Sequence, residues 1–363
     1  MATFIRTEEH AMKKQTNIKP LLLAACLVLA GVGSAHAEEQ VVIATTGGAY
    51  DATLRKFWFE PFTEETGINV VSVAATNAEM RAKASAMVKT GNVTWDLYPD
   101  GEIQASTETH RLTSEDLTEF CKPFRDRPDL VEDACVSAGA RLFSTATLMV
   151  YDPAGFKQGN PSSWADMWDQ TKFPGGRSFP NFDDPWRVMA AALLADGVPR
   201  DKLFPLDVDR ALKKLEEIRP AISLWWKTGD QSVQGFRNGD YSIGQIWLTR
   251  ANTLKAEGRQ IAWSKQASFL VGDRLTIIKD APNRTNALKL VGYWLDHPEA
   301  QAKVCEELLC TPPSRKAIGL MSPAARAALP SDDDIRDYIV IPDAKWINEN
   351  AAMMLERWNA WIR

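Results

Sequence analysis

The chain has 363 residues, of which 45% are hydrophobic, and its mean hydropathy is -0.26. This composition is typical of a soluble globular protein with room for two domains, and it excludes a disordered or fibrous chain. The formal net charge is -5, and no block of Lys or Arg occurs. Charge therefore gives no reason to expect nucleic acid or an anionic membrane as a partner.

The N-terminal segment has the pattern of a secretory signal peptide. Lys13 and Lys14 precede an apolar stretch over 21–32, which is followed by a small-residue segment ending in Ala35-His36-Ala37. A basic region, a short apolar region and an Ala-x-Ala site are the parts of such a signal, and the apolar run is too short to span a bilayer. We predict that residues 1–37 are removed and that the mature protein is periplasmic.

Two details of this segment leave alternatives open. Residues 1–11 contain two glutamates and fit a signal poorly, so Met12 is an alternative start. The residues up to Cys26 are similar to the lipobox of a bacterial lipoprotein. Because the apolar run continues well past Cys26, we favour a soluble exported protein over a lipoprotein.

Short apolar strands alternate with amphipathic helices along the rest of the chain. The patterns predict strands over 41–44, 68–73, 94–98, 145–151, 241–247 and 274–279. They predict helices over 80–89, 187–194, 211–218, 287–295 and 345–362, and a further helix after the first strand that Pro61 kinks or divides. This order indicates an α/β fold with a mainly parallel sheet.

Four residues are expected to mark helix ends. Ser162 or Ser163 is placed to cap a short helix, Thr285 to cap the helix over 287–295, and Pro298 to occupy the first turn of another. His297, just before that proline, is expected to cap the end of the preceding helix.

Four cysteines remain after the signal peptide, and they allow three disulfide pairings. Proximity in the sequence favours Cys121–Cys135 and Cys305–Cys310. A zinc site is the alternative, but the chain has no C-x-x-C and only two histidines after residue 37. We predict structural disulfides, as is common in exported proteins, and expect no metal and no cofactor.

Enzyme motifs are absent from the sequence. It has no G-x-S-x-G, P-loop, H-E-x-x-H or G-x-G-x-x-G. Adjacent acids such as Asp183 and Asp184 are found in glycoside hydrolases, but in a loop flanked by proline they are more often turn residues. The sequence therefore gives no positive support for an enzymatic activity.

Two patterns point to ligand binding instead. Thr46 and Gly47 belong to a turn between a predicted strand and helix, where backbone N–H groups can hold an anion, although a simple tight turn has the same pattern. The 13 tryptophans are many for this length. Six of them lie in predicted loops or at strand ends, namely Trp95, Trp186, Trp225, Trp226, Trp247 and Trp263. Tryptophans with a nearby carboxylate can cage an organic cation, whereas most tryptophans serve core packing.

Six segments occur in one order across nearly the whole mature chain: FTEETGINV (62–70), TWDL (94–97), SWADMW (163–168), FDD (182–184), NGDYSIGQIW (238–247) and HPEAQA (297–302). With these the chain resembles the periplasmic solute-binding proteins of bacterial ABC importers, in the branch of spermidine/putrescine-binding proteins. The resemblance implies a type II periplasmic-binding fold, with two α/β lobes and a ligand cleft between them. One lobe would combine 38–146 with 270–309, and the other 147–269 with 310–363. The chain would cross between the lobes near 144–149, 267–271 and 310–313.

The resemblance also implies a mechanism and several site residues. Such a protein closes on its ligand about a hinge and delivers the ligand, chemically unchanged, to an ABC permease in the inner membrane. We expect the protein to be a monomer. Asp184 matches an acid that pairs with an amine in polyamine binders, Asp273 matches a second such acid, and Trp247 matches a stacking tryptophan.

Other positions depart from the polyamine pattern. The turn with Thr46 and Gly47 stands where those proteins place an aromatic residue, and Glu102 stands about where a tyrosine is expected. Val271 replaces a tryptophan, and Arg187 stands at or near the position of another amine-pairing acid. An arginine suits a carboxylate, whereas it repels a diamine.

We therefore expect a small amine of the polyamine class as ligand, with a zwitterion such as a γ-amino acid, an opine-like compound or an aminophosphonate as the alternative. A salt bridge from Arg187 to Asp183 or Asp184 is an equally good interpretation of that arginine. The alternatives from other classes are an exported hydrolase that uses Asp183, Asp184 or Glu102, and a sensor or adhesion module with the same fold.

Overall fold

The computed structural model describes residues 39–363, so the predicted signal peptide, Met12 and Cys26 lie outside the described residues. Within them, ten strands form one sheet. The strands are β1 (Gln40–Thr45), β2 (Asn69–Ala74), β3 (Leu97–Gly101), β4 (Cys135–Val136), β5 (Gly139–Tyr151), β6 (Arg177–Pro180), β7 (Ile222–Trp226), β8 (Ile243–Trp247), β9 (Ala262–Ile277) and β10 (Ile339–Val340).

Sixteen α-helices surround this sheet in the described part of the chain. They are α1 (Gly48–Leu54), α2 (Glu60–Thr66), α3 (Asn77–Thr90), α4 (Glu108–Thr113), α5 (Thr118–Arg125), α6 (Trp164–Trp168), α7 (Trp186–Ala195), α8 (Val208–Ile218), α9 (Gly229–Asn238), α10 (Leu248–Ala256), α11 (Arg284–Asp296), α12 (Pro298–Leu308), α13 (Arg315–Leu320), α14 (Pro323–Ala328), α15 (Asp332–Asp337) and α16 (Ala344–Ile362). A π-helical turn, η1 (Arg55–Phe59), separates α1 from α2, and Pro61 lies in the first turn of α2, so the predicted division of this helix is confirmed.

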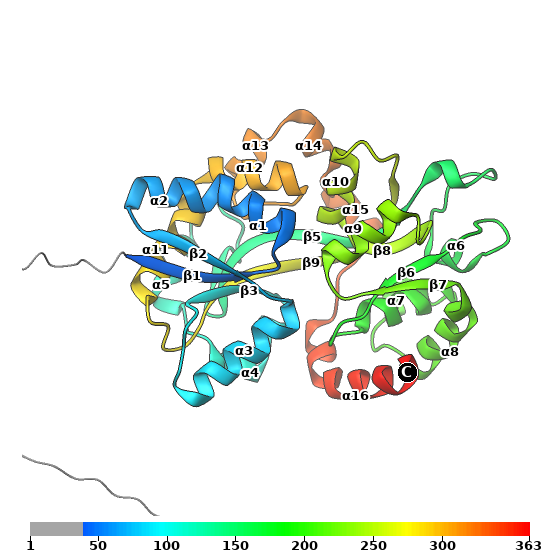
Figure 1. Ribbon diagram of the computed structural model, residues 1–363, viewed down its shortest axis with the longest axis horizontal. Coiled ribbons are helices and arrows are strands. Elements are labelled where there is room, and N and C mark those ends of the chain that lie inside the picture. Colours follow the sequence, from blue (N-terminus) through cyan, green and yellow to red (C-terminus); the bar gives the residue numbers. More distant parts are fainter. Residues whose placement is uncertain (1–38) are drawn as a thin grey trace, which may run out of the picture. The chain divides into compact units, whose positions relative to one another are not determined.

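The order of the strands divides residues 39–363 into two lobes. The sheet runs β2-β1-β3-β9-β5-β8-β6-β7. Parallel pairs lie at its two ends, where β1 pairs with β2 and β3, and β6 pairs with β7 and β8. The long antiparallel strands β5 and β9 cross the middle and join the two sides (Figure 1). This is the two-lobed α/β architecture that the resemblance implies. The prediction of a mainly parallel sheet is wrong, because β9 pairs antiparallel with β3 and β5, and β5 pairs antiparallel with β8.

The crossing strands lie where the resemblance implies them. The segments over 144–149 and 267–271 belong to β5 and β9, and an isolated bridge joins Ser144 to Thr311 as a third connection. The lobe boundaries at residues 146, 269 and 309 stay a prediction. Within residues 39–363 no helix combines the length and the apolarity needed to cross a membrane.

The structure corrects several predicted elements. The strand predicted over 94–98 begins only at Leu97. The strand predicted over 145–151 is part of the longer β5, and the one predicted over 274–279 overlaps the end of the longer β9, which stops at Ile277. Ser163 caps α6, Pro298 starts α12, and His297 ends α11 with its Nδ1 donating to the carbonyl of Tyr293 at 2.8 Å, as predicted.

The predicted helix cap at Thr285 is wrong. The N-cap of α11 is Asn283, whose backbone N and Nδ2 donate to the carboxylate of Asp96 at 2.7 and 3.0 Å. Asp96 is fully buried, so these bonds fix the chain at residue 283 and the helix starts directly after it.

Apolar side chains form two large buried clusters. One includes Trp58 and Trp294 and extends over β1, β3, α11 and α12. The other includes Trp186 and Trp358 and brings the C-terminal helix α16 against β6, α7 and α8. The first cluster also continues into β7, β8 and α9 at the other end of the sheet. Together the clusters hold the strands rigid, so the loops at the strand ends keep fixed positions.

Both predicted disulfides are present. Cys121–Cys135 joins α5 to β4, and Cys305–Cys310 joins α12 to the segment that follows it. All four sulfur atoms are thus in covalent pairs and are not available as thiolate ligands for a metal.

Candidate functional site

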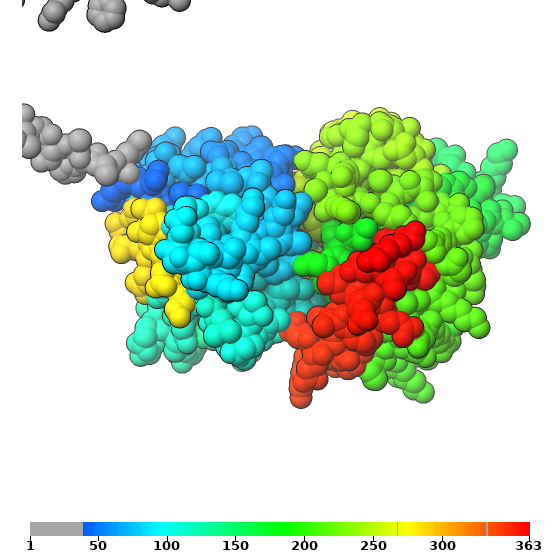
Figure 2. Space-filling view, turned by 60° about the horizontal axis from the view of Figure 1, so that its bottom comes forward, coloured from blue at the N-terminus to red at the C-terminus, as the bar shows by residue number. Residues whose placement is uncertain are grey.

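A cavity of about 690 Å³ opens where the two lobes meet. Its wall combines residues of α1, α3 and β3 from one lobe with residues of β8, α9 and α10 and of the loop before α7 from the other. Figure 2 shows the C-terminal helix α16, in red, beside the lobe that contains α3 and β3. There Asn348 of α16 donates to the carbonyl of Ile103 at 2.8 Å and to Ser106 Oγ at 2.7 Å.

Six of the seven predicted ligand residues line this cavity: Thr46, Glu102, Asp184, Arg187, Trp247 and Asp273. Gly47 does not line it, although its neighbour Thr46 does. Several of these residues lie at strand ends or beside the crossing strands, which explains why segments distant in sequence converge here. Their role toward a ligand stays a prediction.

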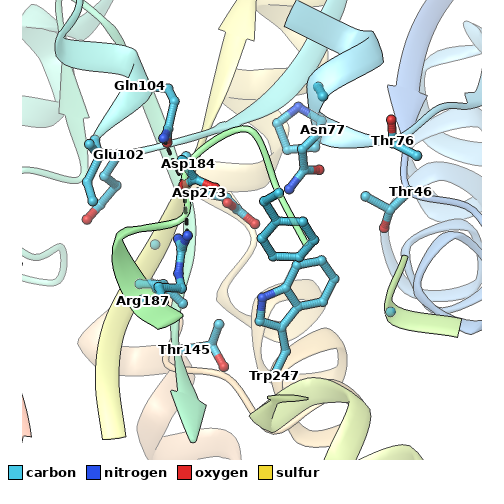
Figure 3. Close-up of a pocket in the computed structure, with 18 of the residues that line it drawn as sticks. Thr46, Thr76, Asn77, Glu102, Gln104, Thr145, Asp184, Arg187, Trp247 and Asp273 are labelled. Atoms are coloured by element: carbon cyan, nitrogen blue, oxygen red, sulfur yellow. Dashed lines mark hydrogen bonds and ion pairs between the residues drawn. The ribbon is translucent and has the colours of Figure 1, made fainter. Parts of the chain in front are cut away.

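Asp273 occupies a central position. It lies on β9, opposite Gly101 of β3 and Phe143 of β5. Within residues 39–363 its carboxylate has no hydrogen-bond or ion-pair partner, and in Figure 3 it faces the same space as Trp247. Burial, together with the carboxylates of Asp100 and Glu102, raises the pKa of Asp273 to about 7 against the lowering effect of Arg187 and Arg81.

Asp184 is held by two protein groups. Arg187 Nη1 lies 2.7 Å and Gln104 Nε2 lies 3.0 Å from Asp184 Oδ2 (Figure 3). The salt bridge that the sequence offered as one interpretation of Arg187 is therefore present. The Arg187 guanidinium also stacks on the ring of Trp186, with 4.7 Å between its central carbon and the ring centre. Its Nε is buried without a partner in the described structure.

The remaining carboxylates of the wall also have partners. Glu102 is 2.9 Å from Arg141 and 3.4 Å from Arg274. Asp183 accepts two hydrogen bonds from Arg81 Nη2, at 2.7 and 2.8 Å. Glu79 closes a capping box with the threonine at the start of α3. Of the five acids of the wall, only Asp273 has no partner among the described residues.

One tryptophan lines the cavity in the described part of the chain. The ring of Trp247 stacks on Phe182, with ring centres 5.6 Å apart, and these two faces form the aromatic part of the wall. Trp186 and Trp226, which the sequence also offered as cage residues, are fully buried in the two cores. For these two residues core packing, the interpretation favoured above for most tryptophans, is present, and Trp247 with Phe182 forms a single stacking surface in the cavity.

Among the wall residues that were not predicted from the sequence are a buried arginine and a buried tyrosine. Arg250 of α10 and Tyr50 of α1 are both buried, with 3% and 7% of their surface exposed, and both line the cavity. Tyr50 lies four residues after Thr46, and Arg250 lies three residues after Trp247. This closeness to predicted site residues is the only signal that the sequence carries for either of them.

Comparison with known proteins places the whole chain in one group. The model of the bacterial extracellular solute-binding proteins matches residues 58–330. The γ-aminobutyric acid-binding protein of Pseudomonas aeruginosa is 29% identical over 341 residues, which are 92% of this chain and 94% of that protein. The spermidine/putrescine-binding periplasmic protein of Escherichia coli is 26% identical, with 90% of each chain covered.

A solved structure is more similar in sequence. The protein AttC of Agrobacterium tumefaciens, in an open unliganded conformation, is 62% identical to this chain, with 90% of this chain and all of that chain covered. The two structures superpose with a TM-score of 0.66.

Proposed function

Because the chain belongs to the bacterial extracellular solute-binding proteins and acts as a periplasmic substrate-binding protein of an ABC transporter, we propose that its cavity captures a small amine. The observation that carries this proposal is the unpartnered carboxylate of Asp273. Ligand binding would then proceed by closure of the two lobes, followed by delivery to the permease.

An ammonium group is the natural partner of Asp273. The carboxylate lies in a cavity where burial disfavours its charge, so an opposite charge that enters the cavity is strongly attracted. Trp247 and Phe182 supply an aromatic wall against which the ligand's CH₂ groups or its ammonium can pack. A neutral or purely anionic ligand would leave Asp273 unpaired.

The zwitterionic alternative has specific support. Four cationic side chains line the cavity, namely Arg81, Arg187, Lys227 and Arg250. A diamine prefers an unpaired carboxylate at each end, and the described residues offer only one. An amine that also carries an acidic group fits this balance better than putrescine does.

Contacts across the cleft support closure as the mechanism. Arg81 of α3 pairs with Asp183 in the loop before α7, and Gln104 donates to Asp184 in the same loop. These bonds join opposite lobes and can form only when the lobes are close. A TM-score of 0.66 against an open relative of 62% identity is what a different angle between the lobes produces.

The hydrolase alternative has less support than a binding protein. Asp183, Asp184 and Glu102, the acids it would use, are each paired with an arginine. We propose that the protein is not an enzyme, is exported with removal of residues 1–37 and works as a monomer with its permease.

Identification of the natural ligand tests the proposal. The protein is purified from the periplasm without added ligand, denatured, and the released small molecules are identified by mass spectrometry. We expect a compound with a primary or secondary amine, recovered intact. Release of a neutral sugar or a simple carboxylic acid, or turnover of the bound amine, would contradict the proposal.

A further inference from the structure

A buried histidine lies behind the wall of the cavity. His110 of α4 and Asp100 of β3 each have 2% of the side chain exposed, and His110 Nδ1 lies 3.2 Å from Asp100 Oδ2. On the other side of the ring, His110 Nε2 lies 3.0 Å from the carbonyl oxygen of Ala138. Neither His110 nor Asp100 lines the cavity, so any effect on a ligand must pass through another residue.

The neighbours of the ring determine where its hydrogens lie. A carbonyl oxygen can only accept, so His110 Nε2 carries a hydrogen that it donates to Ala138. A second hydrogen must lie between Nδ1 and Asp100 Oδ2, because two lone pairs that face each other at 3.2 Å would repel. The pair of His110 and Asp100 therefore holds one hydrogen more than a carboxylate beside a neutral imidazole. This hydrogen reduces the negative charge that Asp100 presents to its other neighbours.

The other oxygen of Asp100 faces an arginine at the cleft. Asp100 Oδ1 lies 3.4 Å from Arg81 Nη1 and accepts a hydrogen bond from the backbone N of Gly101 at 3.0 Å. Arg81 Nη2 lies 2.7 and 2.8 Å from the two carboxylate oxygens of Asp183, which belongs to the opposite lobe. The guanidinium is thus closer to the carboxylate across the cleft than to the carboxylate of its own lobe.

Two carboxylates compete for this arginine. Burial lowers the pKa of Arg81, but Asp100 and Asp183 together raise it above its usual value. Asp100 is buried, whereas the side chain of Asp183 is 41% exposed, so a fully charged Asp100 would attract Arg81 more strongly than Asp183 does. The hydrogen shared with His110 removes this advantage of Asp100, which agrees with the longer distance between Asp100 and Arg81.

We propose that His110 is a positioning residue for the closure of the two lobes. By sharing a hydrogen with Asp100, it lets Arg81 pair with Asp183 across the cleft, and this ion pair slows the release of a bound amine. This inference rests on the proposed function, because it takes the pair of Arg81 and Asp183 as a contact of the closed, ligand-bound protein.

The test measures the release of γ-aminobutyrate and of putrescine from the mature protein by stopped flow. The signal is tryptophan fluorescence, to which Trp247 in the cavity wall contributes. His110→Gln keeps an amide near the position of Nε2 but places no donor at Asp100, so release should become about 2- to 5-fold faster. His110→Asn places its amide near the position of Nδ1 and should restore most of the wild-type rate, which a role in packing alone would not do.

A double-mutant cycle assigns the effect to the contact across the cleft. In the Asp183→Asn background, His110→Gln should change the release rate by less than about 1.5-fold, because the ion pair that His110 supports is already absent. Equal acceleration in both backgrounds would overturn the inference. His297→Gln makes the same change at a histidine that is 33% exposed and outside the cavity wall, and it should leave the release rate unchanged.

A measurement without ligand tests the geometry by itself and separates the two proposals. Nuclear magnetic resonance of the ¹⁵N-labelled imidazole should show a hydrogen on His110 Nε2. A ring with its hydrogen on Nδ1 alone, or equal acceleration in both backgrounds, would overturn the role of His110 and leave the amine proposal standing. Absence of binding for both probes would overturn the amine proposal and this inference with it.

Discussion

Asp273 should make amine binding depend on pH near neutrality. Burial, with Asp100 and Glu102 nearby, raises its pKa to about 7, and an ammonium ligand pairs with the ionised form. The apparent affinity therefore falls with the ionised fraction of this carboxyl. At pH 5 that fraction is about 1%, so the wild-type protein should bind an amine about 100-fold more weakly than at pH 8.

Titration calorimetry at pH 5, 6, 7 and 8 measures this dependence. Near pH 6, binding should release up to one proton, which appears as a dependence of the heat on the ionisation enthalpy of the buffer. The Asp273→Asn variant should bind the amine weakly at every pH, and its affinity should no longer depend on pH. Equal wild-type affinities at pH 5 and pH 8 would refute the reasoning.

The same carboxyl affects the stability of the ligand-free protein with the opposite sign. The pKa of Asp273 is higher in the folded chain than the usual 3.8, so the folded state holds the proton more tightly. Stability is therefore lost as the pH rises from about 4 to about 7, by no more than about 4 kcal/mol. At pH 8, Asp273→Asn should raise the free energy of unfolding by about 1–3 kcal/mol while it weakens binding. A destabilised variant would contradict this assignment.

Three further predictions concern the cleft, the buried ion pair and a disulfide. Asp183→Asn removes the ion pair with Arg81 across the cleft, which contributes about 0.5–1 kcal/mol at its partial exposure. Ligand release, measured by stopped flow, should therefore become about 2- to 5-fold faster. An unchanged release rate would count against closure through this contact. Arg187→Met breaks the mostly buried ion pair with Asp184 and should lower the free energy of unfolding, measured in urea, by about 2 kcal/mol. A loss below about 0.5 kcal/mol would show that this ion pair does not stabilise the fold. Replacing Cys121 and Cys135 by alanine should cost about 3 kcal/mol, and an unchanged melting temperature under oxidising conditions would disprove it.

The sequence predicts the architecture well because local patterns determine it. Alternating strands and helices indicate the α/β class without knowledge of contacts. The N-terminal part of β9, over 262–268, carries several polar residues and shows no strand pattern in the sequence. It is a strand because it pairs with β5, which is a contact between segments more than 100 residues apart. Local propensity cannot reveal such a strand.

The candidate site could be located but its charge balance could not be predicted. The pair between Asp184 and Arg187 is readable, since the two residues are three positions apart. The bond from Gln104 to Asp184 joins opposite lobes and depends on their closure. Tyr50 and Arg250 become site residues only because α1 and α10 meet at the same cavity.

The tryptophans illustrate the same limit for the aromatic wall. Trp226 and Trp247 both lie at the ends of strands, and the sequence does not distinguish them. Trp226 is fully buried with its Nε1 donating to the carbonyl of Gln245 at 3.0 Å, whereas Trp247 lines the cavity. Only the packing of the two lobes separates a core side chain from a binding surface.

A thermal-shift screen of the mature protein tests the amine-binding function most directly. The compounds are polyamines, ω-amino acids, opines, aminophosphonates and quaternary amines, with sugars and simple carboxylates as controls. A ligand at about 100 times its dissociation constant adds about 2.7 kcal/mol of stability, which a melting curve resolves. We predict stabilisation by amine compounds, greatest for ω-amino acids. Stabilisation by a sugar or a simple carboxylate, with no response to any amine, would contradict it.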